Sequence, residues 1–222
     1  MSLPSLLAIE TSVETGSVAF VQNGKVTLER SFLAGRRPSA TLWPALEEVM
    51  REVASLSAIV VGIGPGSYNG SRVGIAAAQG IALVHGCRVV PICSFEGVLT
   101  RTRRALAIGN ARRGSYSLQW LEEGRLQGDF SLVNETELAK ALNKAQEEGV
   151  SILSFDRGEV FPVEEKQQQW IEHHSSQSSV LAQAFLSRNE SERERLLQVN
   201  AEPFYLREPH ITVGKRKSPL ER

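Results

Sequence analysis

The stretch AIVVGIGPGSYNGSRVG, residues 58–74, joins an apolar β-branched run to a glycine-rich loop and to the start of an apolar segment. It predicts a buried strand over 58–63, a loop over 64–71 and a helix over 72–85. Seven of the eighteen glycines lie between Gly62 and Gly86. We therefore expect Gly66 and Gly70 to adopt positive φ or to allow a close backbone contact.

The segments on either side of this stretch predict a mixed sheet covered by helices. Apolar runs come first, at residues 6–10, 17–22 and 26–32, with the hairpin dipeptide Asn23-Gly24 between the last two. A helix over 39–53 precedes the quoted stretch, and a strand over 88–92 follows it. The order β-β-β-α-β-α-β predicts an α/β lobe over residues 1–100, with antiparallel strands joined to a right-handed βαβ unit.

Residues 101–222 predict a second, smaller and looser lobe. Its expected elements are a helix over 94–104, which crosses the boundary, strands over 106–108, 116–121, 126–133 and 150–155, and a helix up to residue 148. Asn134 and Glu137 form a capping box for that last helix, and Gly149 ends it. Residues 164–169 and 175–179 are polar and weakly patterned. Packing of the C-terminal segment back onto the first lobe stays open.

The composition is that of an ordinary globular protein. Hydrophobic residues make up 41% of the 222 residues and charged residues 23%, which excludes a wholly disordered chain. Lys and Arg together number 25, and Asp and Glu together also number 25. This balance argues against a nucleic-acid coat or a polybasic membrane binder. Two cysteines cannot build a disulfide framework, and the longest apolar stretch, 74–84, is too short for a bilayer. We expect a cytoplasmic protein without a signal segment.

The glycine-rich loop has two interpretations. It is either a tight turn that lets the helix pack close to the sheet, or an anion-binding loop at a helix N-terminus. It lacks the Lys-Ser/Thr ending of a P-loop and does not fit the GxGxxG pattern. Arg72 in the first helical turn opposes the helix dipole at a cost of about 0.3–1 kcal/mol. Either Glu10 or a bound anion would offset that cost.

Groups with catalytic or metal-binding chemistry are scarce. The histidines are His85, His173, His174 and His210. No pair among them has the three- or four-residue spacing of metal ligands on one helix face, so we expect no metal site and no catalytic residue. His85 is expected to cap the carbonyls of its helix. Cys87 and Cys93 are expected to be inert packing residues, and no Gly-x-Ser-x-Gly nucleophile motif occurs.

The clusters of basic residues have two interpretations: a solvated surface or a contact with RNA. The clusters are Arg101, Arg103 and Arg104; Arg112 and Arg113; and Lys215, Arg216 and Lys217. Few aromatic residues lie between them, as base stacking would require.

The helix over 72–85 is apolar on nearly every face and rich in Ala and Gly. A surface helix normally has one apolar stripe, so this helix is central to the lobe or is covered by another chain. We predict a helical partner interface, and self-association of the isolated chain through the same surface. The predicted interface residues are Leu42, Leu46, Val49, Val73, Ala77, Ala78 and Ile81.

Two segments carry a resemblance to a known family. They are Leu7-Ala8-Ile9-Glu10-Thr11-Ser12 and the loop motif, whose defining residues are Gly64, Pro65, Gly66, Ser67, Gly70, Arg72 and Gly74. The sequence resembles the bacterial TsaB (YeaZ) family over residues 6–97. That family's loop usually reads Gly-Pro-Gly-Ser-Phe-Thr-Gly-Leu-Arg-Val-Gly, from which Tyr68, Asn69 and Ser71 depart. Asn110 replaces the family's aspartate, residues 36–42 lack its usual His-Ser pair, and residues 203–207 look like its closing Pro-x-Tyr-Leu-Arg.

The resemblance implies a two-lobed actin/sugar-kinase/Hsp70-like (ribonuclease H-like) fold with mixed sheets. It also implies a non-catalytic scaffold that binds a TsaD-like catalytic subunit and a TsaE-like ATPase, and that serves threonylcarbamoylation of the adenosine beside the tRNA anticodon. Glu10, Thr11 and Ser12 would be a vestigial phosphate loop, with ATP and metal on the partner subunits. The alternative is an independent ATP-dependent kinase or ATPase of the same fold. Asn110 and the absence of any Gly-Gly pair speak against that alternative.

Overall fold

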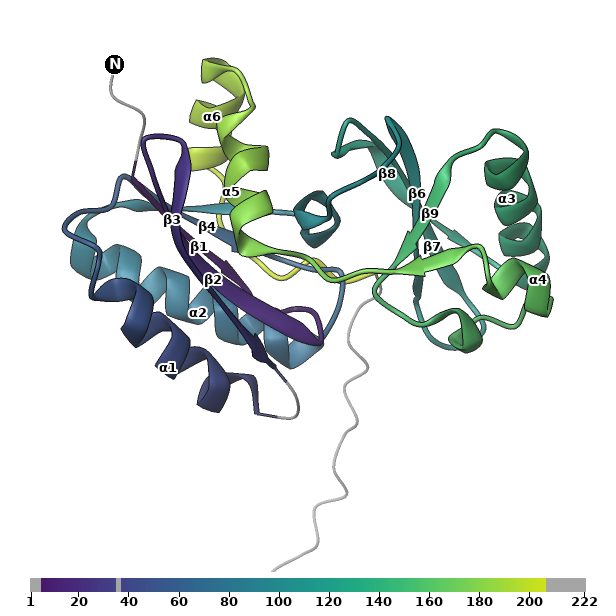
Figure 1. Ribbon diagram of the computed structural model, residues 1–222, viewed down its shortest axis with the longest axis horizontal. Helices are drawn as coiled ribbons and strands as arrows, with labels where there is room; N and C mark the ends of the chain where they lie inside the picture. The colour runs from purple at the N-terminus through teal and green to yellow at the C-terminus, as the bar shows by residue number, and fades with distance from the viewer. Residues whose placement is uncertain (1–4, 35–36, 207–222) are drawn as a thin grey trace, which may run out of the picture.

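The computed structural model describes residues 5–34 and 37–206, which form two lobes side by side, each built on a five-stranded sheet (Figure 1). The strands of the first lobe are β1 (Leu6–Glu10), β2 (Thr15–Gln22), β3 (Lys25–Leu33), β4 (Ala58–Gly62) and β5 (Arg88–Ile92). Those of the second are β6 (Arg104–Asn110), β7 (Tyr116–Glu122), β8 (Arg125–Val133), β9 (Ser151–Ser154) and β10 (Ile171–His173). Arg36, Arg207, His210 and the cluster Lys215, Arg216 and Lys217 lie outside the described residues.

The two sheets have the same topology. The first has the strand order β3-β2-β1-β4-β5 and the second β8-β7-β6-β9-β10. In each, three antiparallel strands are followed by two strands parallel to the first. This repeat confirms the predicted α/β class with two mixed sheets and the β-β-β-α-β-α-β order of the first lobe.

The first sheet is covered on both faces because residues of its central strand point alternately to opposite sides. Leu7 and Ile9 of β1 pack against α1 (Pro38–Met50) and α2 (Tyr68–His85). Leu6 and Ala8 pack in a second core that α5 (Ser178–Leu186) joins from the opposite face (Figure 1). A strand buried on both faces accounts for the continuous apolar run at the start of the chain.

Helix α2 begins four residues earlier than predicted, at Tyr68 instead of Arg72. Ser67 is its N-cap, with the side-chain oxygen accepting from the Gly70 N–H. Gly86 ends the helix with a φ of 64° and donates its N–H to the Ala82 carbonyl. His85 makes no hydrogen bond within the described part of the chain, so the expected His85 cap is wrong and Gly86 takes that role.

In the second lobe, α3 (Glu135–Glu147) packs on one face of the sheet through Leu138, Leu142 and Ala145. The predicted capping box of Asn134 and Glu137 is present. A short helix, α4 (Glu165–Gln168), lies beside α3 (Figure 1).

The predicted helix over 94–104 is wrong. Only one 3₁₀ turn forms there, η1 (Ser94–Gly97), and the chain then crosses to β6 in the second lobe. A second short 3₁₀ turn, η2 (Gly158–Val160), follows β9. Because η1 must join the two sheets, the lobe connection overrides the local apolar pattern.

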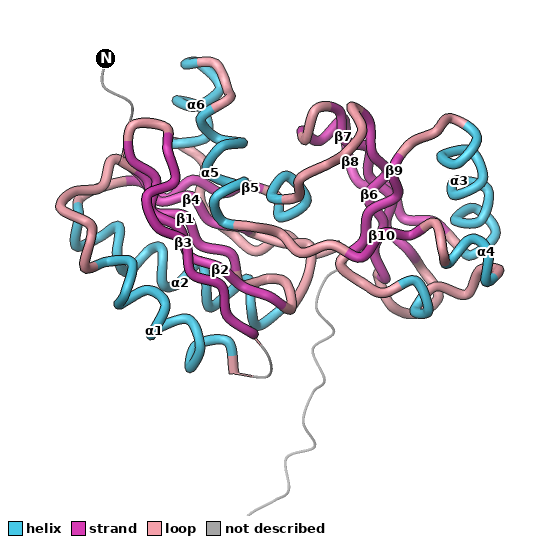
Figure 2. Tube along the Cα trace, in the orientation of Figure 1, coloured by secondary structure: helices cyan, strands magenta, loops and turns pink. Residues whose placement is uncertain are grey.

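The chain returns to the first lobe after β10 (Figure 2). Helix α5 packs on β1, β2 and β4, and α6 (Glu190–Leu197) lies on β5. The following segment reaches Ile63, whose carbonyl accepts from the Phe204 N–H at 2.8 Å. Residues 178–206 therefore belong with the first lobe, where sequence analysis had left the position of the C-terminal segment open.

Within residues 5–34 and 37–206, no helix combines the length and the hydropathy needed to cross a membrane.

Candidate functional site

The glycine-rich loop wraps around the turn that follows β1. A Cβ atom on Gly66 would lie 2.2 Å from the Ser12 carbonyl oxygen, and one on Gly70 would lie 2.1 Å from the Thr11 carbonyl oxygen. Both distances are far below any real Cβ contact, so only glycine fits at these positions. The loop motif and the segment Glu10-Thr11-Ser12, which lie more than fifty residues apart in sequence, are thus one packed unit.

Gly62 and Gly74 complete this packing. A Cβ on Gly62 would lie 2.1 Å from Glu10 Oε2, and one on Gly74 would lie 2.3 Å from Thr11 Oγ1. The glycines of the motif are therefore spaced to follow the Glu10-Thr11-Ser12 turn from the end of β4 into α2.

The polar groups of that turn are used inside the lobe. Glu10, Thr11 and Ser12 are all buried. Thr11 Oγ1 donates to the Gly70 carbonyl at 2.8 Å, and Ser12 donates from both N–H and Oγ to Glu10 Oε1 at 2.7 Å. Ser12 Oγ also shares a hydrogen bond of 2.8 Å with Ser94 Oγ, which accepts from the Gly64 N–H.

These contacts favour the tight-turn interpretation of the loop. In a phosphate loop the hydroxyl and backbone N–H groups face the ligand, whereas here they bind one another and the Ser67 N–H donates to the Ser12 carbonyl at 2.6 Å. Glu10 Oε2 is the exception, since it is buried without a hydrogen-bond partner.

Arg72 does not pair with Glu10 in the part of the chain that the structure describes. Its Nη1 donates to the Tyr68 hydroxyl at 2.9 Å, and its guanidinium lies 5.2 Å from the centre of the Tyr68 ring. Tyr68 in turn stacks on Tyr205 at 4.9 Å between ring centres. Burial, and then the neighbouring Tyr68, raises the pKa of the Tyr205 phenol. A cation–π contact therefore holds Arg72, and Glu10 bonds to Ser12 instead.

A cavity of about 820 Å³ lies between the lobes. Gly66, Ser67 and Tyr68 line it from the first lobe. Arg112 and Arg113 line it from the second, on the turn between β6 and β7, with φ of 66° and 55°. Both arginines are exposed and have no ion pair among the described residues.

Asn110 stands at the second-lobe end of this cavity. Its N–H donates to Asp156 Oδ2 at 2.9 Å, and its own Oδ1 accepts from the Arg112 N–H at 2.8 Å. Asn110 thus shapes the turn and offers no carboxylate. Asp156, which sequence reasoning missed, lies on the cavity because β6 and β9 are parallel neighbours whose ends meet at one sheet edge.

No group of three or more His, Cys, Asp or Glu side chains within the described residues is placed to hold a metal ion. His173 bonds to the Phe155 carbonyl and His174 to Glu172. Burial raises the pKa of both thiols, strongly for Cys93 and less for Cys87. Neither thiol is therefore activated as a nucleophile.

The first basic cluster is largely neutralised. Arg103 pairs with Glu122 and Glu123 at 3.2 and 3.3 Å. Arg104 pairs with Glu148 at 3.3 Å and lies over the Trp120 ring. Of the two basic clusters within the described residues, the pair Arg112 and Arg113 borders the cavity.

The outer face of α1 and α2 carries an apolar groove of about 480 Å³. Trp43 of α1 and Val84 of α2 are 54% and 83% exposed beside it. The groove is lined by Ser39, Trp43, Met50, Val73, Ala76, Ala77, Gly80, Ile81, Val84 and His85.

Most of the predicted interface residues lie elsewhere. Leu42, Leu46, Val49, Ala77 and Ala78 are buried in the core between the helices and the sheet, although Ala77 also touches the groove. Val73 and Ile81 are half-buried and line the groove. Sequence analysis chose the stripe that faces the sheet, because periodicity alone does not distinguish the two apolar faces of a helix.

Several known proteins are similar to this chain in sequence or in fold. A family model described as TsaD, tRNA N6-adenosine threonylcarbamoyltransferase, matches residues 33–119. The chain is 30% identical over 145 residues to the tRNA threonylcarbamoyladenosine biosynthesis protein TsaB of Escherichia coli, covering 60% of each chain. It is 29% identical over 136 residues to the protein of the same name from Haemophilus influenzae, covering 57% of each. The matches thus span about 60% of the length of these relatives.

The fold agrees over nearly the whole chain. The solved structure of YeaZ from Pseudomonas aeruginosa superimposes with a TM-score of 0.68 at 22% identity, covering 92% of this chain and 100% of that one. The chain is thus similar to TsaB proteins in sequence over about 60% of its length, and to the solved YeaZ structure in fold over 92% of it.

Two departures from the TsaB/YeaZ loop have visible roles. Tyr68 stacks on Tyr205 and accepts from Arg72. The hydroxyl of Ser71 donates to the Ser67 carbonyl at 3.0 Å within the first turn of α2. Nothing in the structure explains Asn69.

Proposed function

We propose that this chain is a non-catalytic subunit in the synthesis of threonylcarbamoyladenosine in tRNA, and that it binds a TsaD-like catalytic subunit. Both curated relatives compared above are named for this pathway, and the matching family model is that of the transferase itself. The similarity to the transferase model falls on residues 33–119, which include both helices of the apolar groove.

The groove between α1 and α2 is the observation that carries the proposal. An indole and a valine that line the same groove and are both exposed favour burial against another chain. At about 25 cal/mol per Å² of apolar surface, covering these side chains supplies part of the free energy of association. A helix pair of a partner would fit a groove that itself lies between two helices.

Gly80 supports a helical partner. It lies in the middle of α2 and is exposed in the groove, and a Cβ atom there would have no neighbour within 4 Å. A glycine inside a helix costs about 1 kcal/mol relative to alanine. Unlike Gly70, Gly80 has no close contact in its own lobe that requires glycine. Close approach of a partner's backbone would supply that reason.

The cavity residues support the non-catalytic part. Glu10, Thr11 and Ser12 bond within the lobe, Asn110 is an amide, and the nearby Asp156 carboxylate accepts from the Asn110 N–H. In this proposal ATP and metal are bound by the partner subunits, which include a TsaE-like ATPase. The tRNA is held by the assembled complex, and the isolated chain self-associates through the groove.

Adjacent residues of α2 provide the test. Val84 and Leu83 are 83% and 86% exposed, but only Val84 lines the groove. Val84→Glu should abolish capture of a purified TsaD-like subunit and self-association in analytical ultracentrifugation, because it buries a carboxylate without a partner. Leu83→Glu is the matched control and should behave as the wild type.

Equal binding by both variants would contradict the proposed interface. Loss of binding by Leu83→Glu alone would place the partner on the other side of α2. The rival function would be supported by Mg²⁺-dependent ATP turnover of the isolated chain, with nucleotide affinity in the low micromolar range.

A further inference from the structure

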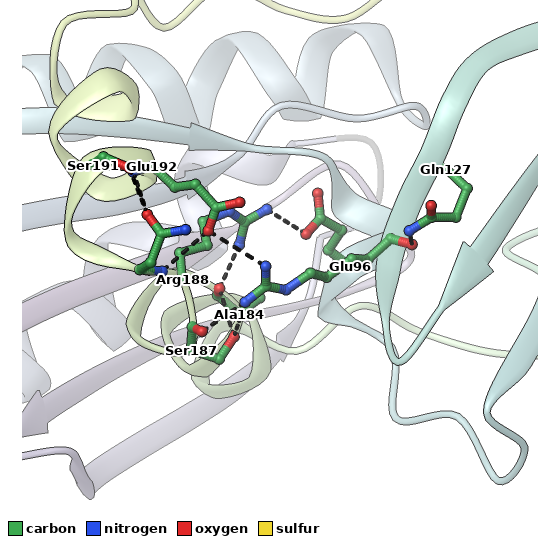
Figure 3. A network of polar contacts seen from close by, with 9 residues as sticks. Glu96, Gln127, Ala184, Ser187, Arg188, Ser191 and Glu192 are labelled. Atoms are coloured by element: carbon green, nitrogen blue, oxygen red, sulfur yellow. Dashed lines mark hydrogen bonds and ion pairs between the residues drawn. The ribbon is translucent and has the colours of Figure 1, made fainter.

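A polar bridge connects the second lobe to the helices that return to the first (Figure 3). Arg125, the first residue of β8, donates from Nη2 to the Ser187 carbonyl at 2.6 Å. Its Nη1 lies 3.5 Å from Glu192 Oε2 on α6. One side chain of the second sheet therefore holds the end of α5 and the start of α6.

A buried ion pair lies beside this bridge. Arg188 Nη2 is 2.5 Å from Glu96 Oε2, and the two side chains are 12% and 7% exposed. Arg188 also donates to the Ala184 carbonyl. Glu96 lies in η1, so the pair ties the crossing segment to the end of α5 (Figure 3). Breaking a buried ion pair leaves a buried charge without a partner, which costs free energy. The pair therefore opposes movement of the crossing segment away from α5.

Aromatic rings fill the same junction. Phe95 of η1 stacks on Phe155 of the second lobe, with ring centres 4.3 Å apart and planes 11° apart. Phe130 of β8 contacts Phe95 at 6.3 Å and Phe204 at 4.9 Å. The rings of both lobes thus interdigitate, and separation of the lobes would expose them to water.

Helix α5 is itself fixed to the first sheet. The carboxylate of Glu29 on β3 accepts from the Ser178 hydroxyl and from both the N–H and the hydroxyl of Ser179, at 2.8 to 3.1 Å. The Ser178 N–H donates to Ser17 Oγ at 2.8 Å. Because α5 moves with the first lobe, each contact of Arg125 with its end is a contact between lobes.

We propose that this junction is a latch that holds the two lobes in one orientation, with Arg125 and Arg188 as its positioning residues. A two-lobed protein that works by closing on a ligand needs a junction that bends at low cost. Here hydrogen bonds, a buried ion pair and packed rings all bridge the crossing point. The cavity of about 820 Å³ accordingly keeps its width whether or not a ligand is present. The latch is independent of the proposed partner and of the threonylcarbamoyl pathway.

Pulsed electron–electron double resonance, which measures the distance between two spin labels, tests the latch on the full chain. Spin labels at Ser55→Cys in the first lobe and Lys140→Cys on α3 would report the distance between lobes, in a Cys87→Ala background that leaves the buried Cys93. Ser55 and Lys140 are exposed and lie outside the junction. The expected result is a single narrow distance, unchanged by Mg²⁺-ATP or by a TsaD-like partner.

Arg125→Ala should widen that distribution, on the order of two-fold, because unlatched orientations become populated. Arg103→Ala, which breaks exposed ion pairs within the second lobe, is the matched control and should leave it narrow. Glu192→Gln removes the negative charge that faces Arg125 and leaves a neutral acceptor, so it serves if Arg125→Ala does not fold, with a smaller widening expected. A broad or two-peaked distribution in the wild type, or no widening in a folded latch variant, would overturn the proposal.

Discussion

Two alanine substitutions in one helix should change stability in opposite directions. Gly70 and Gly80 both lie in α2, so Gly70→Ala and Gly80→Ala are the same chemical change in the same element. The difference is the surroundings of the new methyl group. At Gly70 it would lie 2.1 Å from the Thr11 carbonyl oxygen, and at Gly80 it meets nothing within 4 Å.

The magnitude follows from the contact at Gly70. Ordinary contact begins at 3.4 Å, so the Thr11 carbonyl must move by about 1.3 Å, the difference from 2.1 Å. Such a shift strains the hydrogen bonds of Thr11 Oγ1 to Gly70 and of Ser67 to Ser12, each worth about 0.5–1.5 kcal/mol. Overpacking adds about 1–3 kcal/mol, while better helix propensity returns about 1 kcal/mol. The expected net loss is about 3 kcal/mol.

Gly80→Ala has only the propensity gain and should stabilise the lobe by about 1 kcal/mol. Chemical denaturation of both variants, followed by circular dichroism, measures the free energy of unfolding directly. In thermal melts, 1 kcal/mol corresponds to about 2–4 °C for a chain of this size. Gly70→Ala as stable as the wild type would refute the idea that the loop glycines serve the turn after β1. A destabilising Gly80→Ala would refute the open environment of Gly80.

Further outcomes follow from the buried groups and the cavity. Iodoacetamide should label Cys87 slowly and Cys93 only after unfolding, because burial raises the pKa of both thiols; rapid labelling of Cys93 in peptide mass spectra would contradict its burial. Burial raises the pKa of Glu96 above its usual 4.5, so the folded chain holds that proton more tightly than the unfolded chain. The free energy of unfolding of the wild type relative to Glu96→Gln should therefore fall as the pH rises from about 4 to about 7, and a constant difference would show that the pKa is not raised. The isolated chain should bind ATP weakly or not at all; calorimetric binding tighter than about 10 μM, roughly −7 kcal/mol, would contradict this.

Several elements could be predicted because their signal is local. The alternation of apolar runs and turns indicated the strands of the first lobe, and Asn134 with Glu137 marked the start of α3. The clustering of glycines after β4 indicated that the backbone there must approach something closely. These patterns depend on neighbours within a few residues, which sequence reasoning can follow.

Other features depend on contacts between distant segments. The Thr11 carbonyl is the reason for Gly70, yet fifty-nine residues separate them. Helix α5 begins with polar residues whose pattern does not predict a helix. Its first turn is held by the hydroxyls of Ser178 and Ser179, which donate to the Glu29 carboxylate.

The sequence by itself determined the succession of strands and helices along the first lobe, the need for glycine in the loop and the scarcity of catalytic groups; the order of the strands within the sheet came from the structure. Only the tertiary structure decided which side of α2 is exposed, that Leu42 and Ala78 belong to the core, and that Arg125 joins the two lobes. The physical reason is that the apolar periodicity shows which faces of a helix carry apolar side chains. It does not show which neighbouring element covers each face. Burial is a property of the assembled chain, and it assigned the inner faces of α1 and α2 to the sheet and left Trp43 of α1 and Val84 of α2 on the outer faces.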